Sequence, residues 1–294
     1  MLTLHNVSKE ADFDIMCKIE SAICKNGAQK FWQMHPGGLY YDRYLFGSGA
    51  MDVFEYGKLL YKGDTAAGYL LAYREEGEFV LRLQKEYEEY TEEALELVSG
   101  CFEGDVPYTT IVNSNNRTLC DALLRHGFIK AAEERYQSVL SLQSWEPRES
   151  AGGTENIALF TRADIPERVL HAAIPSGSEV SEDMFHTYLD SPAYDNALEY
   201  VVRDGQTNAF AGFATWWVDD YSQTALLEPV ACLPEYRRRG IARRLLSSGL
   251  NKLKEMGMQY AFVSTSIDHE EAIPLYDSLG FVKTGKANLY VKQK

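Results

Sequence analysis

The chain repeats part of its own sequence at a distance of about half its length. The segment LCDALLRHGFIKA (Leu119–Ala131) resembles AIPLYDSLGFVKT (Ala272–Thr284), and a Gly-Phe pair stands at the same place in both. A second block, KEYEEYTEEALELVSG (Lys85–Gly100), aligns with PEYRRRGIARRLLSSG (Pro234–Gly249), with one tyrosine in register. Two blocks that recur in the same order at nearly the same separation predict two domains of similar fold.

The length of 294 residues agrees with two domains, because each half is long enough to bury a core of its own. A polar stretch with proline, serine and glycine, EPRESAGGT (146–154), follows an alternating, strand-like run. We therefore predict a first domain over residues 1–145, a linker over 146–154 and a second domain over 155–294.

In the second half, short runs rich in β-branched and aromatic residues alternate with segments of helical periodicity. A helix is predicted over about 240–256 and another over about 269–279, and Gly257 and Gly280 stand where these helices end. The order β-β-β-α-β-α-β indicates an α/β fold with a mixed, mostly antiparallel sheet flanked by helices, and the repeat extends this expectation to the first half. The predicted strands are EYVVRDG, AFAGFATWWV, TALLEPVACL, YAFVSTS and FVKTGKANLYVK.

The charge balance argues against one broad class of function. The chain carries 29 Lys and Arg against 43 Asp and Glu, a net charge of −14, whereas nucleic-acid binding depends mainly on neutralising phosphates. No apolar run approaches the length of a membrane span, and the acidic start MLTLHNVSKEADFDIM lacks the pattern of a signal peptide. The five cysteines include no C-x-x-C pair, so neither disulfides nor a metal site is predicted. We expect a cytoplasmic protein without nucleic-acid or membrane partners, and its oligomeric state stays open.

The start of the predicted helix over 240–256 contradicts local helix rules. Arg237, Arg238 and Arg239 lie at the positive end of the helix dipole, where each cation costs roughly 0.3–1 kcal/mol, and Gly240 costs about 1 kcal/mol relative to alanine. A bound phosphate or pyrophosphate would offset both, since free backbone N–H groups, the dipole and the arginines favour an anion. On spacing alone, a solvated basic cluster is an equally good interpretation. The motifs G-x-x-x-x-G-K-[ST] and G-x-G-x-x-G are absent, which argues against nucleotide hydrolysis and dinucleotide redox chemistry.

Two motifs together resemble those of the GNAT superfamily of N-acetyltransferases. Arg237-x-x-Gly240-x-Ala242 follows an apolar strand and is similar to the family's pyrophosphate loop, R/Q-x-x-G-x-G/A. Downstream, HEEAIPLYDSLGF (His269–Phe281) resembles the family's N-x-x-A-x-x-L-Y-x-x-x-G-F helix and turn at the expected distance. The resemblance covers about residues 156–294 and implies a GNAT fold that binds acetyl-CoA as a cosubstrate.

The resemblance also implies which residues bind acetyl-CoA. The backbone of residues 230–232 would line the pantetheine arm, and the amides of residues 238–243 would hold the diphosphate. Pro229 fits independently, because a proline in a buried strand marks a bulge or splay, although a strand that ends early is the alternative. His269 stands where the family often has an asparagine that contacts CoA, and a histidine can also donate. The predicted cofactor-binding residues are Val230, Ala231, Cys232, Arg237, Arg238, Arg239, Gly240, Ile241, Ala242, Arg243 and His269.

The family reaction requires a deprotonated amine and a protonated leaving thiolate, and the sequence offers one group for each. Glu228 lies on the strand just before the loop and can accept the ammonium proton, directly or through water. A carboxylate that only binds a cationic substrate or a neighbouring arginine is the alternative. Tyr276 matches the family's helix tyrosine, whose hydroxyl can reach the CoA sulfur as a general acid. Its alternative role is that of a core aromatic.

The first half lacks these features. The acidic stretch Glu88–Thr91, EEYT, stands opposite the three arginines and the glycine, so a CoA diphosphate would meet like charges, and Leu123 replaces Tyr276. This half resembles a degenerate GNAT domain with a structural role, such as shaping the acceptor cleft. The aromatic and glycine-rich segment Phe31–Gly49 can reach over the active domain; a mobile loop or a core-packing segment is the alternative.

These features predict an acetyl-CoA-dependent N-acetyltransferase whose active site lies in the second domain. The acceptor would be a primary amine of a small molecule or a peptide. The alternative is a non-catalytic protein that binds acyl-CoA as a sensor or scaffold. The presence of both Glu228 and Tyr276 favours the enzyme.

Overall fold

Two sets of six strands join into one continuous sheet within the part of the chain that the structure describes. The computed structural model describes residues 1–27, 34–46, 53–73, 77–102, 106–147, 154–176, 180–269 and 271–293. The first half provides β1 (Leu2–Asn6), β2 (Gly57–Lys62), β3 (Thr65–Tyr73), β4 (Glu78–Leu83), β5 (Tyr108–Asn113) and β6 (Ile129–Ser141). The second half provides β7 (Asn156–Leu159), β8 (Ala197–Arg203), β9 (Phe210–Asp219), β10 (Thr224–Cys232), β11 (Tyr260–Ser266) and β12 (Val282–Lys292).

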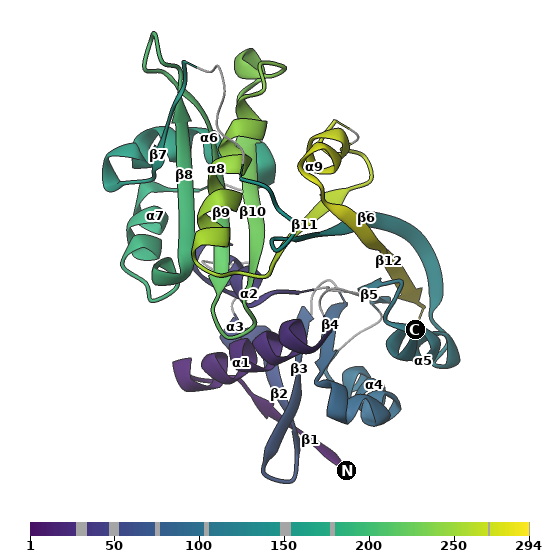
Figure 1. The fold of residues 1–294 in the computed structure, drawn as a ribbon. Coiled ribbons are helices and arrows are strands. Elements are labelled where there is room, and N and C mark those ends of the chain that lie inside the picture. Colours follow the sequence, from purple (N-terminus) through teal and green to yellow (C-terminus); the bar gives the residue numbers. More distant parts are fainter. Residues whose placement is uncertain are drawn as a thin grey trace.

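Helices cover both faces of this sheet (Figure 1). The first half contains α1 (Glu10–Gly27), α2 (Pro36–Tyr41), the π-helical turn η1 (Asp42–Phe46), α3 (Val53–Tyr56), the 3-10 helix η2 (Lys85–Tyr90), α4 (Thr91–Ser99) and α5 (Arg117–Arg125). The second half contains η3 (Arg162–Asp164), α6 (Ile165–Ser176), α7 (Glu182–Leu189), η4 (Tyr194–Asn196), η5 (Pro234–Tyr236), α8 (Ile241–Glu255) and α9 (Ile273–Leu279).

The predicted α/β fold class is confirmed. Every strand and helix expected in the second half is present as β8 to β12, α8 and α9, while β7, α6 and α7 were not predicted. The repeat is visible as structure, because α5 and α9 both end at a glycine with a left-handed backbone, Gly127 (φ 82°) and Gly280 (φ 93°). Among the described strands, only β4 with β5 and β10 with β11 pair in parallel, and the other neighbours are antiparallel.

The two halves exchange their last strands, which the sequence did not reveal. The strand order is β1-β2-β3-β4-β5-β12-β6-β11-β10-β9-β8-β7, so β6 pairs with β11 of the second half and β12 pairs with β5 of the first. These two long strands also pair with each other at the centre (Figure 1). The predicted linker lies mostly outside the described residues, and the domain boundaries stay predictions.

Each face of the second half's sheet has its own core. One core lies under α8 and contains Trp216, which is fully buried against Gly249; a Cβ on this glycine would lie 2.0 Å from the indole nitrogen. The other core contains Trp217, also fully buried, together with side chains of α6, α7 and α2. The strands that carry the candidate site are therefore held from both sides.

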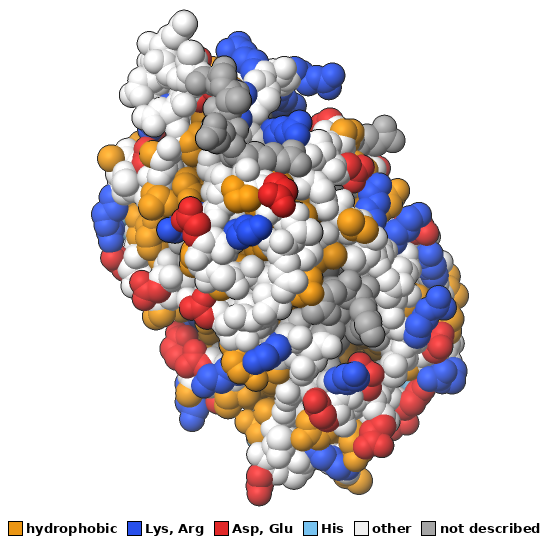
Figure 2. Space-filling view, viewed as in Figure 1, with side chains coloured by type: hydrophobic (Ala, Val, Ile, Leu, Met, Phe, Trp, Pro, Cys, Tyr) orange, Lys and Arg blue, Asp and Glu red, His pale blue; other side chains and the backbone are white. Residues whose placement is uncertain are grey.

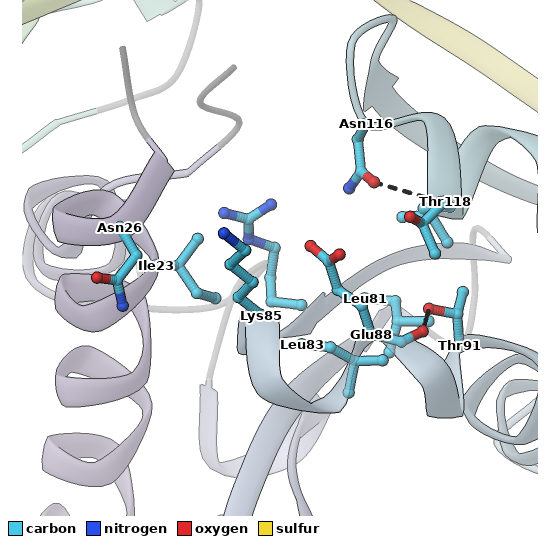
Figure 3. Close-up of a pocket in the computed structure, with 11 residues that line it drawn as sticks. Ile23, Asn26, Leu81, Leu83, Lys85, Glu88, Thr91, Asn116 and Thr118 are labelled. Atoms are coloured by element: carbon cyan, nitrogen blue, oxygen red, sulfur yellow. Dashed lines mark hydrogen bonds between the residues drawn. The ribbon is translucent and has the colours of Figure 1, made fainter. Parts of the chain in front are cut away.

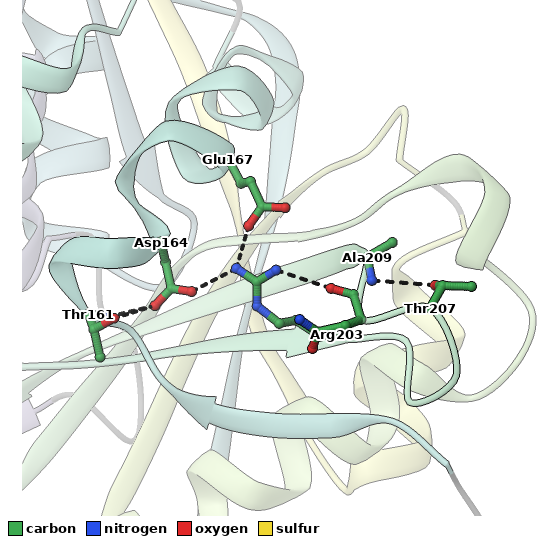
Figure 4. Close-up of polar contacts among 7 residues, drawn as sticks. Thr161, Asp164, Glu167, Arg203, Thr207 and Ala209 are labelled. Atoms are coloured by element: carbon green, nitrogen blue, oxygen red, sulfur yellow. Dashed lines mark hydrogen bonds and ion pairs between the residues drawn. The ribbon is translucent and has the colours of Figure 1, made fainter.

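An arginine attaches the start of α6 to the sheet (Figure 4). Arg203 of β8 donates to Asp164 (2.8 Å) and to Glu167, and Thr161 also donates to Asp164 (2.8 Å). Burial raises the pKa of Asp164, but the hydrogen bonds from Arg203 and Thr161 lower it by more. The pKa of this carboxyl group is therefore below its ordinary value. This network fixes the connection between β7 and α6.

The described residues contain no cluster of side chains that could bind a metal ion and no helix that could span a membrane. All five cysteines carry free thiols, and no group of three or more His, Cys, Asp and Glu side chains in the described ranges could hold a metal ion. Among the helices placed by the structure, none has both the length and the apolar character needed to cross a bilayer.

Candidate functional site

A bulge interrupts β10 at its centre. The register between β9 and β10 shifts between Leu227 and Val230, so that Glu228 and Pro229 together face one residue of β9. On its other edge, β10 pairs with β11 only from Thr224 to Leu226. The bulge and splay predicted at Pro229 are therefore present. Beyond the splay, the edge of residues 230–232 that faces β11 has no ladder partner among the described residues.

The loop between β10 and α8 turns through two left-handed residues. Arg238 has φ 62° and Gly240 has φ 75°, and Gly240 precedes α8 without any side chain capping the helix. Turns of this kind point successive N–H groups toward one place and form anion-binding concavities, and the uncapped N–H groups of α8 add to them. The predicted anion site thus has a fitting backbone. A left-handed conformation at Arg238, a non-glycine residue, costs roughly 1–2 kcal/mol and was not foreseen.

Arginine side chains brace this loop from both ends. Arg237 Nε donates to the carbonyl oxygen of Cys232 (3.1 Å), and Arg244 Nη2 donates to the carbonyl oxygen of Arg239 (3.2 Å). Arg244 also pairs with Glu155 at 2.6 Å. Arg238 and Arg239 are exposed, and Figure 2 shows basic side chains gathered at the end of the molecule that carries this loop. Sequence analysis missed Arg244, whose spacing of four residues from Gly240 was the available signal.

Glu228 of β10 and Tyr276 of α9 lie close enough to influence each other electrostatically. Tyr276 of α9 is 7% exposed and packs edge-on against Phe281, with ring centroids 5.8 Å apart. Burial raises the pKa of its hydroxyl, and the charge of Glu228 raises it further, whereas a hydrogen bond with Thr265 lowers it. Glu228 is half-buried, and burial raises the pKa of its carboxyl group, while Arg135 of β6 lowers it.

His269 takes a more peripheral position at the start of the α9 segment. Its backbone N–H donates to the carbonyl oxygen of Ser266 (3.1 Å), and its own carbonyl accepts from Ala272 (3.1 Å). Its side chain is exposed. The residue therefore shapes the turn between β11 and α9.

Part of the Phe31–Gly49 segment reaches the second half, and the rest of it lies outside the described residues. Within it, α2 packs on β9 and β10, with Tyr41 edge-on to Trp217 at 6.1 Å. The described part of the segment is therefore a core-packing element that lies on strands of the second half. Its Asp42 was missed by sequence analysis, since no local pattern connects it to Glu228.

The first half has a cavity of about 240 Å³ where the repeat places the equivalent of the loop before α8 (Figure 3). Figure 3 shows the carboxylate of Glu88 and the amino group of Lys85 on facing sides of it. Tyr90, which precedes α4, has φ −93° and lacks the left-handed turn. The side-chain oxygen of Asn116 accepts a hydrogen bond from Leu119 N (3.2 Å) and so caps α5. At this position the first half therefore differs from the loop before α8 both in its backbone conformation and in its charged side chains.

Comparisons with known proteins agree with this geometry. Residues 167–281 match the model of the acetyltransferase (GNAT) family. The N-alpha-acetyltransferase 30 of Schizosaccharomyces pombe is 37% identical over 54 residues, which make up 18% of this chain and about a third (36%) of that protein.

Solved structures resemble the chain over its whole length. A tandem GNAT protein from the clavulanic acid biosynthesis pathway aligns with a TM-score of 0.67 and 12% identity over 100% of this chain and 98% of its own. A GNAT-family acetyltransferase from Colwellia psychrerythraea aligns with a TM-score of 0.64 and 14% identity over 99% and 100%. At such identities these likenesses describe the fold, which is that of GNAT proteins in both halves. The match to the acetyltransferase (GNAT) family covers residues 167–281 and therefore lies in the second half of the chain.

Proposed function

We propose that this protein is an acetyl-CoA-dependent N-acetyltransferase with a single active site, in its second half. One observation carries the proposal: the splay of β10, the left-handed loop and the Glu228–Tyr276 pair all occur in the half that matches the family. The acceptor is a primary amine of a small molecule or a peptide. The name of the yeast relative, an N-alpha-acetyltransferase, supports an amine acceptor.

The residues of the loop fit a coenzyme A ligand. Arg238 and Gly240 turn backbone N–H groups toward the position of a diphosphate, and the free β10 edge at residues 230–232 offers N–H and carbonyl groups to a pantetheine amide. The amides of residues 238–243 hold the diphosphate, with the exposed arginines as counter-charges. Acetyl-CoA, when bound, supplies the activated acetyl thioester.

Two side chains move the protons. The Glu228 carboxylate accepts a proton from the acceptor ammonium, directly or through water, and its raised pKa makes it a stronger base than an exposed glutamate. The Tyr276 hydroxyl donates its proton to the leaving sulfur. The hydroxyl carries this proton at neutral pH, because burial and the charge of Glu228 raise its pKa above the ordinary value for tyrosine.

The first test is a calorimetric titration with acetyl-CoA that measures stoichiometry, followed by a turnover assay with primary amines. We expect one site per chain, and we expect Arg238→Glu to abolish it while Arg117→Glu, an exposed reversal on α5, leaves it intact. Two sites would mean that the first half binds acetyl-CoA as well. Binding without turnover of any amine would favour the sensor or scaffold, and no binding would overturn the proposal.

A further inference from the structure

The first half of the chain brings an acidic residue, Asp42, close to the strands that carry Glu228. Tyr41, the last residue of α2, packs edge-on against Trp217 at 6.1 Å, and Trp217 Nε1 donates to the carbonyl oxygen of Glu228 at 2.6 Å. Asp42 follows Tyr41 directly and is half-buried. Only one indole ring therefore separates the end of α2 from the backbone of the proposed base.

A hydrogen-bond network fixes α2 in this position. His35 Nδ1 accepts from Gly37 N (2.9 Å), so Nε2 carries the proton and donates to Thr224 Oγ1 of β10 (2.9 Å). Thr224 Oγ1 in turn lies 2.6 Å from Ser222 Oγ. Burial lowers the pKa of His35 to about 4, which keeps the ring neutral and this arrangement intact near neutral pH.

The exchanged strand β6 brings a cation to the same face of the sheet. Phe262 of β11 contacts His35 edge-on at 6.0 Å, which places its side chain on the α2 side. Ser266 lies four positions further along β11 and shares that side, and Arg135 is its direct partner on β6. The Arg135 side chain is exposed and forms no ion pair within the described ranges.

Glu228, Asp42 and Arg135 influence one another electrostatically. Burial raises the pKa of Asp42 to about 8, and the charge of Glu228 contributes to this rise, so this carboxyl group is mostly protonated at neutral pH while no cation lies beside it. Arg135 acts in the opposite sense on Glu228 and lowers its pKa. Glu228 therefore lies within electrostatic range of the Asp42 carboxyl group from η1 and the Arg135 guanidinium from β6. Both of these groups come from the other half of the chain.

We propose that Asp42 and Arg135 complete the acceptor site and that the acceptor is a zwitterion, a primary amine that also carries a carboxylate. The inference rests on the proposed function and deepens it. The ammonium group binds beside Glu228 and Asp42, where its positive charge favours loss of the Asp42 proton, and the carboxylate pairs with the Arg135 guanidinium, whose planar fork matches it. The first half thus supplies specificity to an active site whose cofactor residues all lie in the second half.

The test uses the full-length chain and matched sets of amines. Each set contains a protein amino acid, its amide, and the amine left after decarboxylation, so that the members differ in the carboxylate alone. We expect kcat/KM for the amino acid to exceed that for its two partners by about tenfold or more, as for a charge-assisted hydrogen bond. Arg135→Gln should remove this preference, and Arg135→Lys should restore part of it.

The second variant tests how the ammonium group of the acceptor is bound. Asp42→Asn should raise KM for every acceptor by about tenfold, while the dissociation constant for acetyl-CoA, measured by calorimetry, stays the same. The matched controls are Asp183→Asn, an exposed position on α7, and Arg117→Gln, an exposed position on α5. They should change neither KM nor the preference.

The outcomes separate this inference from the function on which it rests. Acetylation of amines without a preference for the carboxylate, or variants with wild-type KM, would overturn the inference and leave the acetyltransferase standing. Failure to acetylate any amine despite acetyl-CoA binding would overturn both.

Discussion

The surroundings of Tyr276 keep its hydroxyl group protonated. Its hydroxyl is buried among apolar side chains and close to a carboxylate, and both raise its pKa. Tyr276→Phe removes the acid and keeps the ring. We expect kcat, measured by steady-state kinetics, to fall by about 10²–10⁴-fold. The dissociation constant for acetyl-CoA, measured by calorimetry, should stay unchanged. Tyr221→Phe, which alters a tyrosine 59% exposed, is the control, and an unaltered kcat for Tyr276→Phe would remove this hydroxyl from the mechanism.

His35 makes the stability of the protein depend on pH. Burial lowers its pKa from 6.5 to about 4, so between these values the unfolded chain binds a proton that the folded chain does not. Its contribution to stability is complete above the unfolded pKa and decreases as pH falls toward about 4, by at most about 3 kcal/mol. Urea unfolding across this range should show the loss, and His35→Gln should reduce it. His5→Gln, at an exposed position, should keep the wild-type dependence; an identical slope in both variants would refute the role of His35.

Among the elements, those with a local signal were predictable and those held by distant contacts were not. The helix predicted over 240–256 is observed as α8 at Ile241–Glu255. It could be predicted because its own residues show helical periodicity and a glycine follows its end. By contrast α2, PGGLYY, contains a proline and two glycines and has poor helix propensity. It forms because His35 caps it and because Trp217 packs against it.

The same division applies to the candidate site. Glu228 and Tyr276 were found from motifs, since each lies in a segment whose chemistry the sequence displays. Asp42 and Arg135 were not, because their relation to Glu228 depends on the fold of a chain segment more than ninety residues away in each case.

The two glycines of α2 test how closely this helix sits on the sheet. A Cβ on Gly37 would lie 2.0 Å from Trp217 Cβ, whereas one on Gly38 would lie 3.7 Å from Leu226 Cδ2, an ordinary contact. We expect Gly37→Ala to lower the free energy of unfolding by about 1–3 kcal/mol and to reduce kcat/KM by moving Asp42. Gly38→Ala should be neutral or stabilise by up to about 1 kcal/mol, measured by denaturant unfolding. Equal effects at the two positions would contradict the packing of α2.

At the scale of the whole molecule, the strand exchange makes the two halves depend on each other. The pairing of β6 with β12 is nearly two-fold symmetric: Val282, the first residue of β12, pairs with Val139, and Ile129, the first residue of β6, pairs with Val291. Each half therefore completes the sheet of the other. The second half depends on the first for the partner of β11 on this edge, because that partner is β6.

This symmetry predicts what the second half does alone. Residues 154–294 keep β7 to β12 but lose β5 and β6, which leaves one edge of β11 and both edges of β12 unpaired, a state that favours association. A second copy can fill both gaps, because its own β12 can occupy the place of β6. We expect a strand-exchanged dimer by light scattering, and we expect insoluble protein when residues 282–294 are also removed. A folded monomer of residues 154–294 would show that the exchange is dispensable and that the second half is an independent domain.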